Sequence, residues 1–174
     1  MKELSLSKNE ILVKMHDIEL FQYFNNIEKE RLLFASEVLE FDYGEKIIEQ
    51  GDISAYLYVI LDGKVNINLE KADGSSVYID SSAKGEILGE ASIFINVKRT
   101  ANVIAASKVL MIQIERNSLI NFMKNNPEAG LKMQMVIIYS LLQRLKDSNQ
   151  ELAFERKNTM KGSDMSDMMK LVGK

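Results

Sequence analysis

The stretch GEILGEASIFINVKRTANVIA, residues 85–105, decides how the rest of the chain is interpreted. It contains the pair Gly89-Glu90, and Arg99 follows nine residues after the glutamate. An arginine presents a planar fork that matches phosphate oxygens, and backbone N–H groups freed beside a glycine can form an anion-binding nest. A carboxylate accepts hydrogen bonds from sugar hydroxyls. The stretch therefore predicts a site for a ligand that carries a phosphate and a sugar together.

Further residues on both sides of this stretch fall into an ordered pattern. Thr100 and Ala101 follow the arginine, and upstream the pairs Gly44-Glu45 and Gly51-Asp52 and then Gly63 punctuate short apolar runs. In this order and spacing, from about residue 20 to about residue 150, the chain resembles the cyclic nucleotide-binding domain family, of the catabolite activator and protein kinase A regulatory subunit type. Lys98 stands where the family commonly has a proline before the arginine, which adds a positive charge beside the anion site.

The resemblance implies a role for each residue of the cassette, residues 85–105. Glu90 would bind the ribose 2′-hydroxyl, Arg99 would bind the cyclic phosphate, and Gly89 would leave room for the sugar. The predicted ligand-binding set is Gly89, Glu90, Ala91, Ser92, Arg99, Thr100 and Ala101. The ligand it implies is a cyclic nucleotide, with cAMP preferred and cGMP compatible with the Thr100 hydroxyl; no other cofactor is expected.

Composition limits the remaining function classes. A chain of 174 residues that is 46% hydrophobic can bury one core, and a net charge of −3 argues against a protein that coats nucleic acid. There is no cysteine, and His16 is the only histidine, which disfavours zinc sites and Ser-His or Cys-His catalysis. No apolar run is long enough to span a membrane, and the first ten residues are too polar for a signal peptide. We therefore expect a cytoplasmic protein that is not an enzyme, with no metal site and no membrane or nucleic-acid partner.

Hydrophobic periodicity predicts an α+β fold that is mainly β. Residues 1–36 have helical spacing, with a capping box from Ser7 to Glu10 and a second helix capped by Asn25 or Asn26. Residues 37–114 change to short Val-, Ile- and Tyr-rich runs between turns, which predicts an all-β sandwich or barrel. The resemblance implies that its eight strands form an antiparallel β-roll of jelly-roll type. Asp62-Gly63 is a two-residue hairpin signal. The predicted strands are 37–42, 45–50, 56–61, 64–70, 76–80, 86–88, 101–106 and 109–114.

Helical spacing returns in residues 115–154. Asn126-Pro127-Glu128 predicts the start of a long helix that ends near Phe154. A heptad seam within residues 131–152 favours a homodimer, with a second stripe packed on the β-roll; the alternative is that both stripes pack on the chain's own β-domain. Residues 155–174 are predicted to be a flexible or docking tail, so an effector protein would dock on the helix or the tail. The seam is Leu131, Met135, Ile138, Leu142, Leu145, Asn149 and Leu152; the second stripe is Met133, Ile137 and Leu141.

Three functional interpretations follow from the sequence. The first is a sensor that binds a cyclic nucleotide and relays it through movement of the C-terminal helices. The second is a scaffold of the same fold with an empty pocket, which acts by dimerisation. The third, a metal enzyme of the related double-stranded β-helix type, needs two histidines and a carboxylate, and the single histidine argues against it. About twenty residues follow the long helix, too few for a helix-turn-helix domain, which predicts a standalone member of bacterial type without DNA-binding function.

Overall fold

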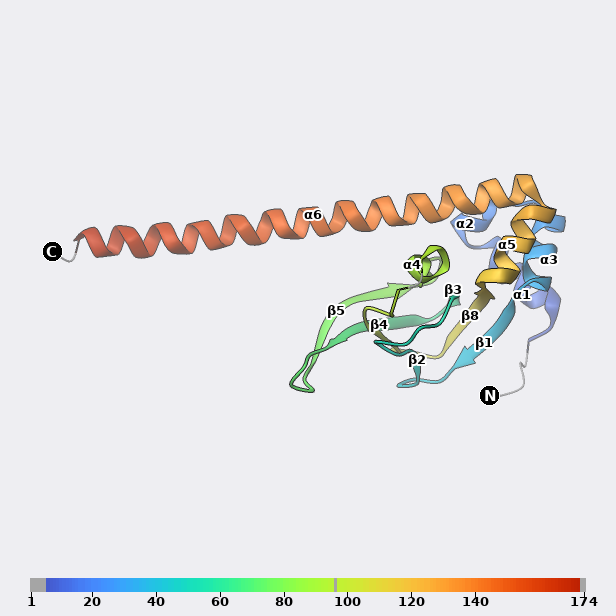
Figure 1. The fold of residues 1–174 in the computed structure, drawn as a ribbon, viewed down its shortest axis with the longest axis horizontal. Helices are drawn as coiled ribbons and strands as arrows, with labels where there is room; N and C mark the ends of the chain where they lie inside the picture. The colour runs from blue at the N-terminus through green and yellow to red at the C-terminus, as the bar shows by residue number, and fades with distance from the viewer. Residues whose placement is uncertain (1–5, 96, 173–174) are drawn as a thin grey trace. The chain divides into compact units, whose positions relative to one another are not determined.

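A computed structural model of the chain describes residues 6–95 and 97–172, with side chains up to residue 154 (Figure 1). The chain divides into two units, Met1–Ile137 and Ile138–Lys174. The first unit holds every strand and all the shorter helices, and the last helix runs from it into the second unit.

Eight antiparallel strands form two four-stranded sheets, which confirms the predicted fold. One sheet has the order β1-β8-β3-β6 and the other the order β2-β7-β4-β5. The strands are β1 (Glu37–Phe41), β2 (Lys46–Ile48), β3 (Tyr56–Asp62), β4 (Lys64–Glu70), β5 (Ser76–Ala83), β6 (Ile87–Leu88), β7 (Asn102–Ala105) and β8 (Val109–Glu115).

The sheet that contains β3 and β8 is buried on both faces, which explains why these strands are continuous apolar runs. Because side chains alternate along a strand, β3 serves two cores. Leu57 and Val59 pack into a cluster with the helices, whereas Tyr58 and Ile60 point into the roll between the sheets.

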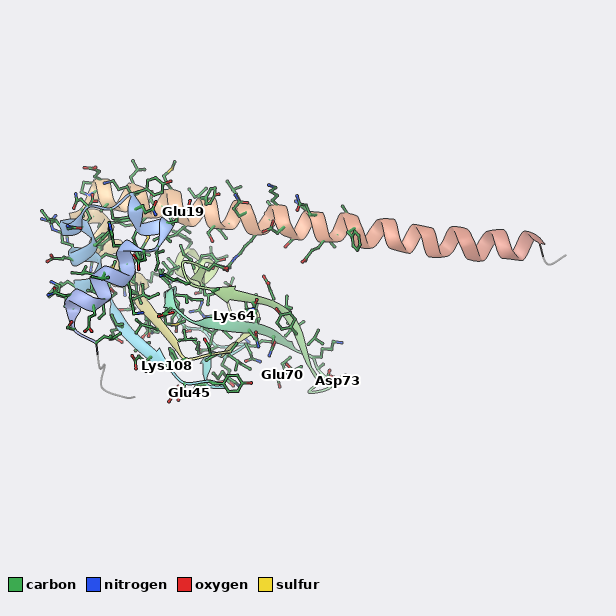
Figure 2. The ribbon with its side chains drawn as sticks, turned by 180° about the vertical axis from the view of Figure 1, so that it is seen from behind. Glu19, Glu45, Lys64, Glu70, Asp73 and Lys108 are labelled. Carbon is green, nitrogen blue, oxygen red and sulfur yellow. The ribbon has the colours of Figure 1, made fainter. Side chains whose placement is uncertain are left out.

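The second sheet shows the predicted alternation only in part. On β4, Val65 is buried and Ile67 is half-buried, but Leu69 is 37% exposed. The pairing of β4 with β7 ends at Asn68, so the β4–β5 hairpin beyond it is paired on one side only. Glu70 and Asp73 lie in this part of the hairpin (Figure 2).

The N-terminal helices follow the predicted capping signals. α1 (Lys8–His16) has the capping box between Ser7 and Glu10, and α3 (Asn26–Phe34) has one between Asn25 and Glu28. Between them lies a short helix, α2 (Glu19–Gln22), which buries Phe21. The first five residues of the predicted helical segment lie outside the described residues.

The predicted Asp62-Gly63 hairpin is wrong. β3 and β4 follow one another directly but belong to different sheets, so the chain turns a corner here instead of folding back. Gly63 has φ +89°, and in the described part of the chain only glycines have a positive φ. A Cβ at Gly63 would meet the backbone carbonyl of Lys108 and the Cα of Val109, so the corner needs glycine for space as well as for φ.

Two helices follow the roll, α5 (Arg116–Asn125) and α6 (Pro127–Val172). α6 begins at Pro127 as predicted, but the Asn126 side-chain oxygen accepts a hydrogen bond from Arg31 of α3, at 2.6 Å. The helix continues beyond the predicted end near Phe154, because a glycine inside a helix, such as Gly162, costs only about 1 kcal/mol.

The two apolar stripes of α6 have different environments. Met133 and Ile137 are fully buried in the helical core cluster of the first unit, as predicted, while Leu141 is 41% exposed. The heptad seam is exposed along its whole length. The methionine-rich part of the predicted tail lies outside the residues whose side chains are described, and its docking role stays a prediction. Among the described residues, no helix is long and apolar enough to cross a membrane.

Candidate functional site

The site is built at the end of β6, where Gly89 ends the strand and caps a five-residue helix, α4 (Glu90–Phe94). Gly89 has φ +79°, a left-handed conformation that side chains disfavour. The Ser92 hydroxyl donates to the Gly89 carbonyl at 2.8 Å, and the Ile93 side chain anchors the helix in the core. The predicted helical turn over residues 92–95 therefore exists, and it begins two residues earlier.

The structure gives Gly89 a different task from the predicted clearance of a sugar. A Cβ at this position would collide with Nη1 of Arg99 and lie 2.6 Å from the carbonyl oxygen of Tyr56. Gly89 is thus required, within the protein itself, by the close approach of the Arg99 guanidinium. Space for the ligand's sugar at Gly89 stays a prediction.

Arg99 is buried, and its guanidinium is held by three neutral acceptors from two segments of the chain. Nε donates to Oγ of Ser54 at 3.2 Å, Nη2 to the Tyr56 carbonyl at 2.8 Å, and Nη1 to the Gly89 carbonyl at 3.4 Å. The Arg99 N–H also donates to the Asp52 carbonyl at 2.8 Å, which fixes the backbone. These three side-chain bonds use three of the five N–H donors of a guanidinium.

Burial and neighbouring groups act on the charge of Arg99 in opposite directions. Burial lowers the pKa of Arg99, and Tyr58, Asp52 and Glu90 partly offset this effect. The Tyr58 ring lies 5.8 Å from the guanidinium carbon, within the range of a cation–π contact. Burial also raises the pKa of Tyr58, so its hydroxyl stays protonated near neutral pH. Among the residues that the structure describes, no carboxylate forms an ion pair with Arg99.

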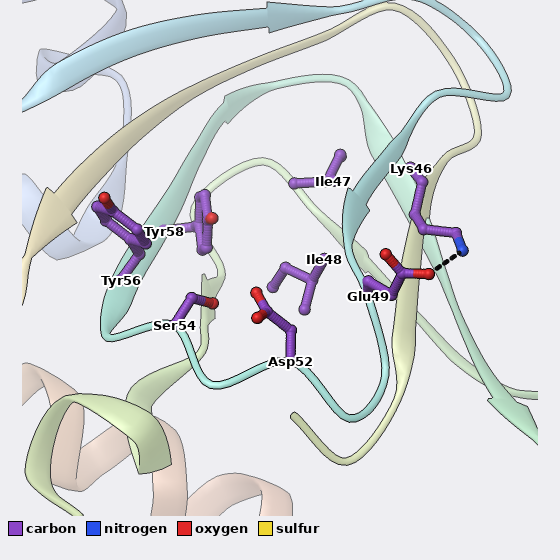
Figure 3. Close-up of a pocket in the computed structure, with 8 residues that line it drawn as sticks. All are labelled: Lys46, Ile47, Ile48, Glu49, Asp52, Ser54, Tyr56 and Tyr58. Atoms are coloured by element: carbon purple, nitrogen blue, oxygen red, sulfur yellow. Dashed lines mark hydrogen bonds and ion pairs between the residues drawn. The ribbon is translucent and has the colours of Figure 1, made fainter. Parts of the chain in front are cut away.

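A pocket of about 380 Å³ opens beside these groups (Figure 3). Figure 3 shows Ser54, Tyr56 and Tyr58 on one side of the pocket and Ile48 and Asp52 facing them. Ser54 and Tyr56, which accept hydrogen bonds from Arg99, therefore also line the pocket, whereas Gly89 and Arg99 do not. Its lining is Lys46, Ile47, Ile48, Glu49, Asp52, Ser54, Tyr56 and Tyr58.

The predicted site residues gather around α4, with different exposure. Glu90 and Ser92 are buried, as is Arg99, whereas Ala91 and Thr100 are exposed and Ala101 is half-buried. Glu90 lies close enough to raise the pKa of Arg99, but it does not line the pocket. The structure thus brings Gly89, Glu90 and Arg99 together. Among the described residues, no cluster of three or more possible metal ligands exists.

Sequence reasoning missed Arg116, the first residue of α5. Its Nη2 donates to the carbonyl of Ser92 and, at 3.3 Å, to the carbonyl of Ile95. α4 is thereby bonded to Arg99 at its first turn and to Arg116 at its last. Tyr58 and Ser54 were also missed, because a tyrosine within an apolar strand and a serine in a loop carry no ligand-binding signal in a single sequence.

Comparison with known proteins agrees with this geometry. The model of the cyclic nucleotide-binding domain matches residues 38–126, just over half of the chain. The chain belongs to the cyclic nucleotide-binding domain family. The match covers nearly all of the roll, the cassette and α5, and it therefore includes the residues of the site described above.

Relatives of this cyclic nucleotide-binding domain include proteins of both bacteria and animals. A CRP-like cAMP-activated global transcriptional regulator of Mycobacterium tuberculosis is 27% identical over 115 residues, which cover 66% of this chain and 50% of that protein. The cAMP-dependent protein kinase type II regulatory subunit of Drosophila melanogaster is 29% identical over 98 residues, 56% of this chain and 26% of that protein. The chain therefore spans half or less of the curated relatives named here.

A solved structure of a cyclic nucleotide-binding domain from Methylobacillus flagellatus superposes with a TM-score of 0.73 at 25% identity. The match covers 84% of this chain and 83% of that one. The likeness extends beyond the residues that the family model matches, and it supports the roll and its flanking helices as one architecture.

Proposed function

We propose that this protein is a cyclic nucleotide sensor. The observation that carries the proposal is the buried Arg99 guanidinium, which neutral acceptors hold beside a pocket while two of its N–H donors are not engaged in the bonds described above. A cyclic phosphate has one negative charge and two exocyclic oxygens, which match one cation with two donors. Glu90 supplies the carboxylate for the ribose hydroxyl.

cAMP is the preferred ligand in this proposal, and cGMP is the alternative. The bacterial relative is named as cAMP-activated and the animal relative as cAMP-dependent, which supports cAMP. The exposed Thr100 hydroxyl is compatible with either purine.

Isothermal titration with cAMP, cGMP and a cyclic dinucleotide tests ligand binding. We expect micromolar or tighter binding of one nucleotide and a loss of about 2–5 kcal/mol of binding free energy in Arg99→Ala, because a buried charge pair loses one member. Lys71→Ala is the control, since it also removes one positive charge but Lys71 is exposed and does not line the pocket. No heat with any nucleotide would reject the sensor and favour the scaffold interpretation.

We further propose that the bound signal passes from α4 to α5 through Arg116. An anion that draws the cassette inward would move the Ser92 and Ile95 carbonyls, and Arg116 ties both to the first turn of α5. In Arg116→Gln we expect nucleotide binding to remain, and the nucleotide-induced change in hydrogen exchange across residues 116–137 to be lost. An unchanged exchange response in this variant would exclude Arg116 as the link.

The exposed heptad seam of α6 supports a homodimer as part of the proposed function. Its members within residues 131–145 are each more than half exposed, and Asn149 occupies a seam position that can set register. A second copy presents the same stripe and would bury it.

A further inference from the structure

Arg99 is oriented by four groups, of which two belong to side chains. The carbonyls of Tyr56 and Gly89 are backbone acceptors, whereas the Ser54 hydroxyl and the Tyr58 ring are side-chain partners. Figure 3 shows Ser54 and Tyr58 along the same wall of the pocket. Only these two partners can be altered by substitution without displacing the backbone.

The two side chains restrain different freedoms of the guanidinium. The Ser54 hydroxyl accepts from Nε, the nitrogen nearest the chain, and therefore fixes the rotation of the guanidinium plane about its stem. The Tyr58 ring lies against the guanidinium and limits its tilt. Tyr58 is 6% exposed and packs with Ile48 and Val103 in the roll core, so the ring itself has little freedom.

Both partners are neutral, which matters for an anion site. A carboxylate that oriented Arg99 by a direct ion pair would compete with the phosphate for its charge. A hydroxyl and an aromatic face hold the same geometry and leave the positive charge to the ligand.

We propose that Ser54 and Tyr58 are positioning residues that hold Arg99 in its anion-binding orientation before the ligand arrives. The proposal rests on the proposed function for its effect on nucleotide affinity. Its structural part concerns the nucleotide-free protein and can be measured there. A preorganised arginine loses less conformational entropy when it binds, which increases affinity.

The first readout is the exchange rate of the Arg99 Nε proton in nucleotide-free protein, followed by ¹⁵N NMR. The chain contains five arginines, so the Nε signals are few and Arg99→Lys identifies the relevant one. We expect slow exchange in the unmodified protein, faster exchange in Ser54→Ala and Tyr58→Leu, and little change in Tyr58→Phe, which keeps the ring. Tyr43→Leu is the matched control, because Tyr43 is 80% exposed and does not line the pocket.

The second readout is a double-mutant cycle on nucleotide affinity, with thermal melts to verify folding. Tyr58→Leu is expected to weaken binding about two- to tenfold, as for one side chain that must be ordered on binding. The same substitution should have no further effect in the Arg99→Ala background, because no arginine is left to position.

The outcomes separate the two claims. Equal losses in both backgrounds, or unchanged exchange of the Arg99 Nε proton in Tyr58→Leu and Ser54→Ala, would overturn the positioning role. A Tyr58→Phe variant as weak as Tyr58→Leu would also overturn it, because the hydroxyl would then act on the ligand directly. If the unmodified protein binds no nucleotide but the exchange rates change as expected, the proposed sensor function is rejected. The positioning of Arg99 by Ser54 and Tyr58 is then still supported.

Discussion

Replacing Gly89 with alanine tests why this position requires glycine. The two explanations are the close approach of the Arg99 guanidinium and the space needed by a ligand. Gly89→Ala introduces two separate costs. A left-handed φ of +79° costs an L-residue about 1–2 kcal/mol. The new Cβ also lies 2.6 Å from the Tyr56 carbonyl and collides with Nη1 of Arg99, so the guanidinium has to leave.

Gly44→Ala isolates the first cost from the second. Gly44 has φ +84°, and a Cβ there would have no atom within 4 Å. Both variants therefore force alanine into the same left-handed backbone conformation, but only Gly89→Ala displaces Arg99. Loss of the bond to the carbonyl of the half-buried Tyr56 adds about 1–3 kcal/mol.

We expect urea denaturation to show a loss of unfolding free energy of about 1–2 kcal/mol for Gly44→Ala and about 2–5 kcal/mol for Gly89→Ala. Titration should show unchanged nucleotide affinity for Gly44→Ala and at least tenfold weaker binding for Gly89→Ala. If the two variants lose equal stability and Gly89→Ala binds nucleotide normally, the close approach of Arg99 does not explain the glycine, and the reasoning is refuted.

Two further predictions concern the helices that flank the roll. Burial opposes ionisation of Glu28, but hydrogen bonds from Lys132, at 2.9 and 3.0 Å, and from the Asn25 N–H hold its pKa below the usual 4.5. A lowered folded-state pKa stabilises the protein above about pH 4.5, and this contribution is lost as the pH falls through the folded value. Glu28→Gln should therefore lower the free energy of unfolding by about 1–2 kcal/mol at pH 7. Between pH 6 and pH 3 this variant should lose less of its unfolding free energy than the unmodified protein loses. If both proteins lose the same amount over this range, the pairing of Glu28 with Lys132 is contradicted. For the seam, Leu142→Lys should convert a dimer to a monomer by light scattering, whereas Asp147→Lys, which places the same side chain outside the seam, should not; a monomer before any substitution would reject the dimer.

Periodicity predicted most of the fold because each strand has an apolar pattern of its own. The runs at Tyr56–Asp62 and Val109–Glu115 were located within a residue because they are buried on both faces. The Asp62-Gly63 signal failed for a physical reason: a tight turn requires the same backbone freedom whether the next strand returns to the same sheet or crosses to the other. Only the pairing of distant strands distinguishes these cases, and one sequence does not contain that information.

The part of the candidate site that could be predicted consists of residues close together in the sequence. Gly89, Glu90 and Arg99 lie within eleven residues, and the structure brings them together. The role of Arg116 was not predictable, because it donates to backbone carbonyls more than twenty residues away. Every residue type has a backbone carbonyl, so the residue types at these positions do not indicate the contact. The same holds for Tyr58, whose contact with Arg99 arises from the closing of the roll.

In the proposed relay, α4 would link the site to α5, because so short a helix has little stability of its own. A five-residue helix is far below the length at which helices are stable alone, so its position is set by its contacts. Arg99 donates to the carbonyl of its cap, Gly89, and Arg116 donates to the carbonyls of Ser92 and Ile95. Two charged donors from different segments thus hold opposite ends of one short element. In the proposed relay, an anion bound to Arg99 would act on the first end of α4 only, and a shift of α4 that keeps the Arg116 bonds would carry the first turn of α5 with it.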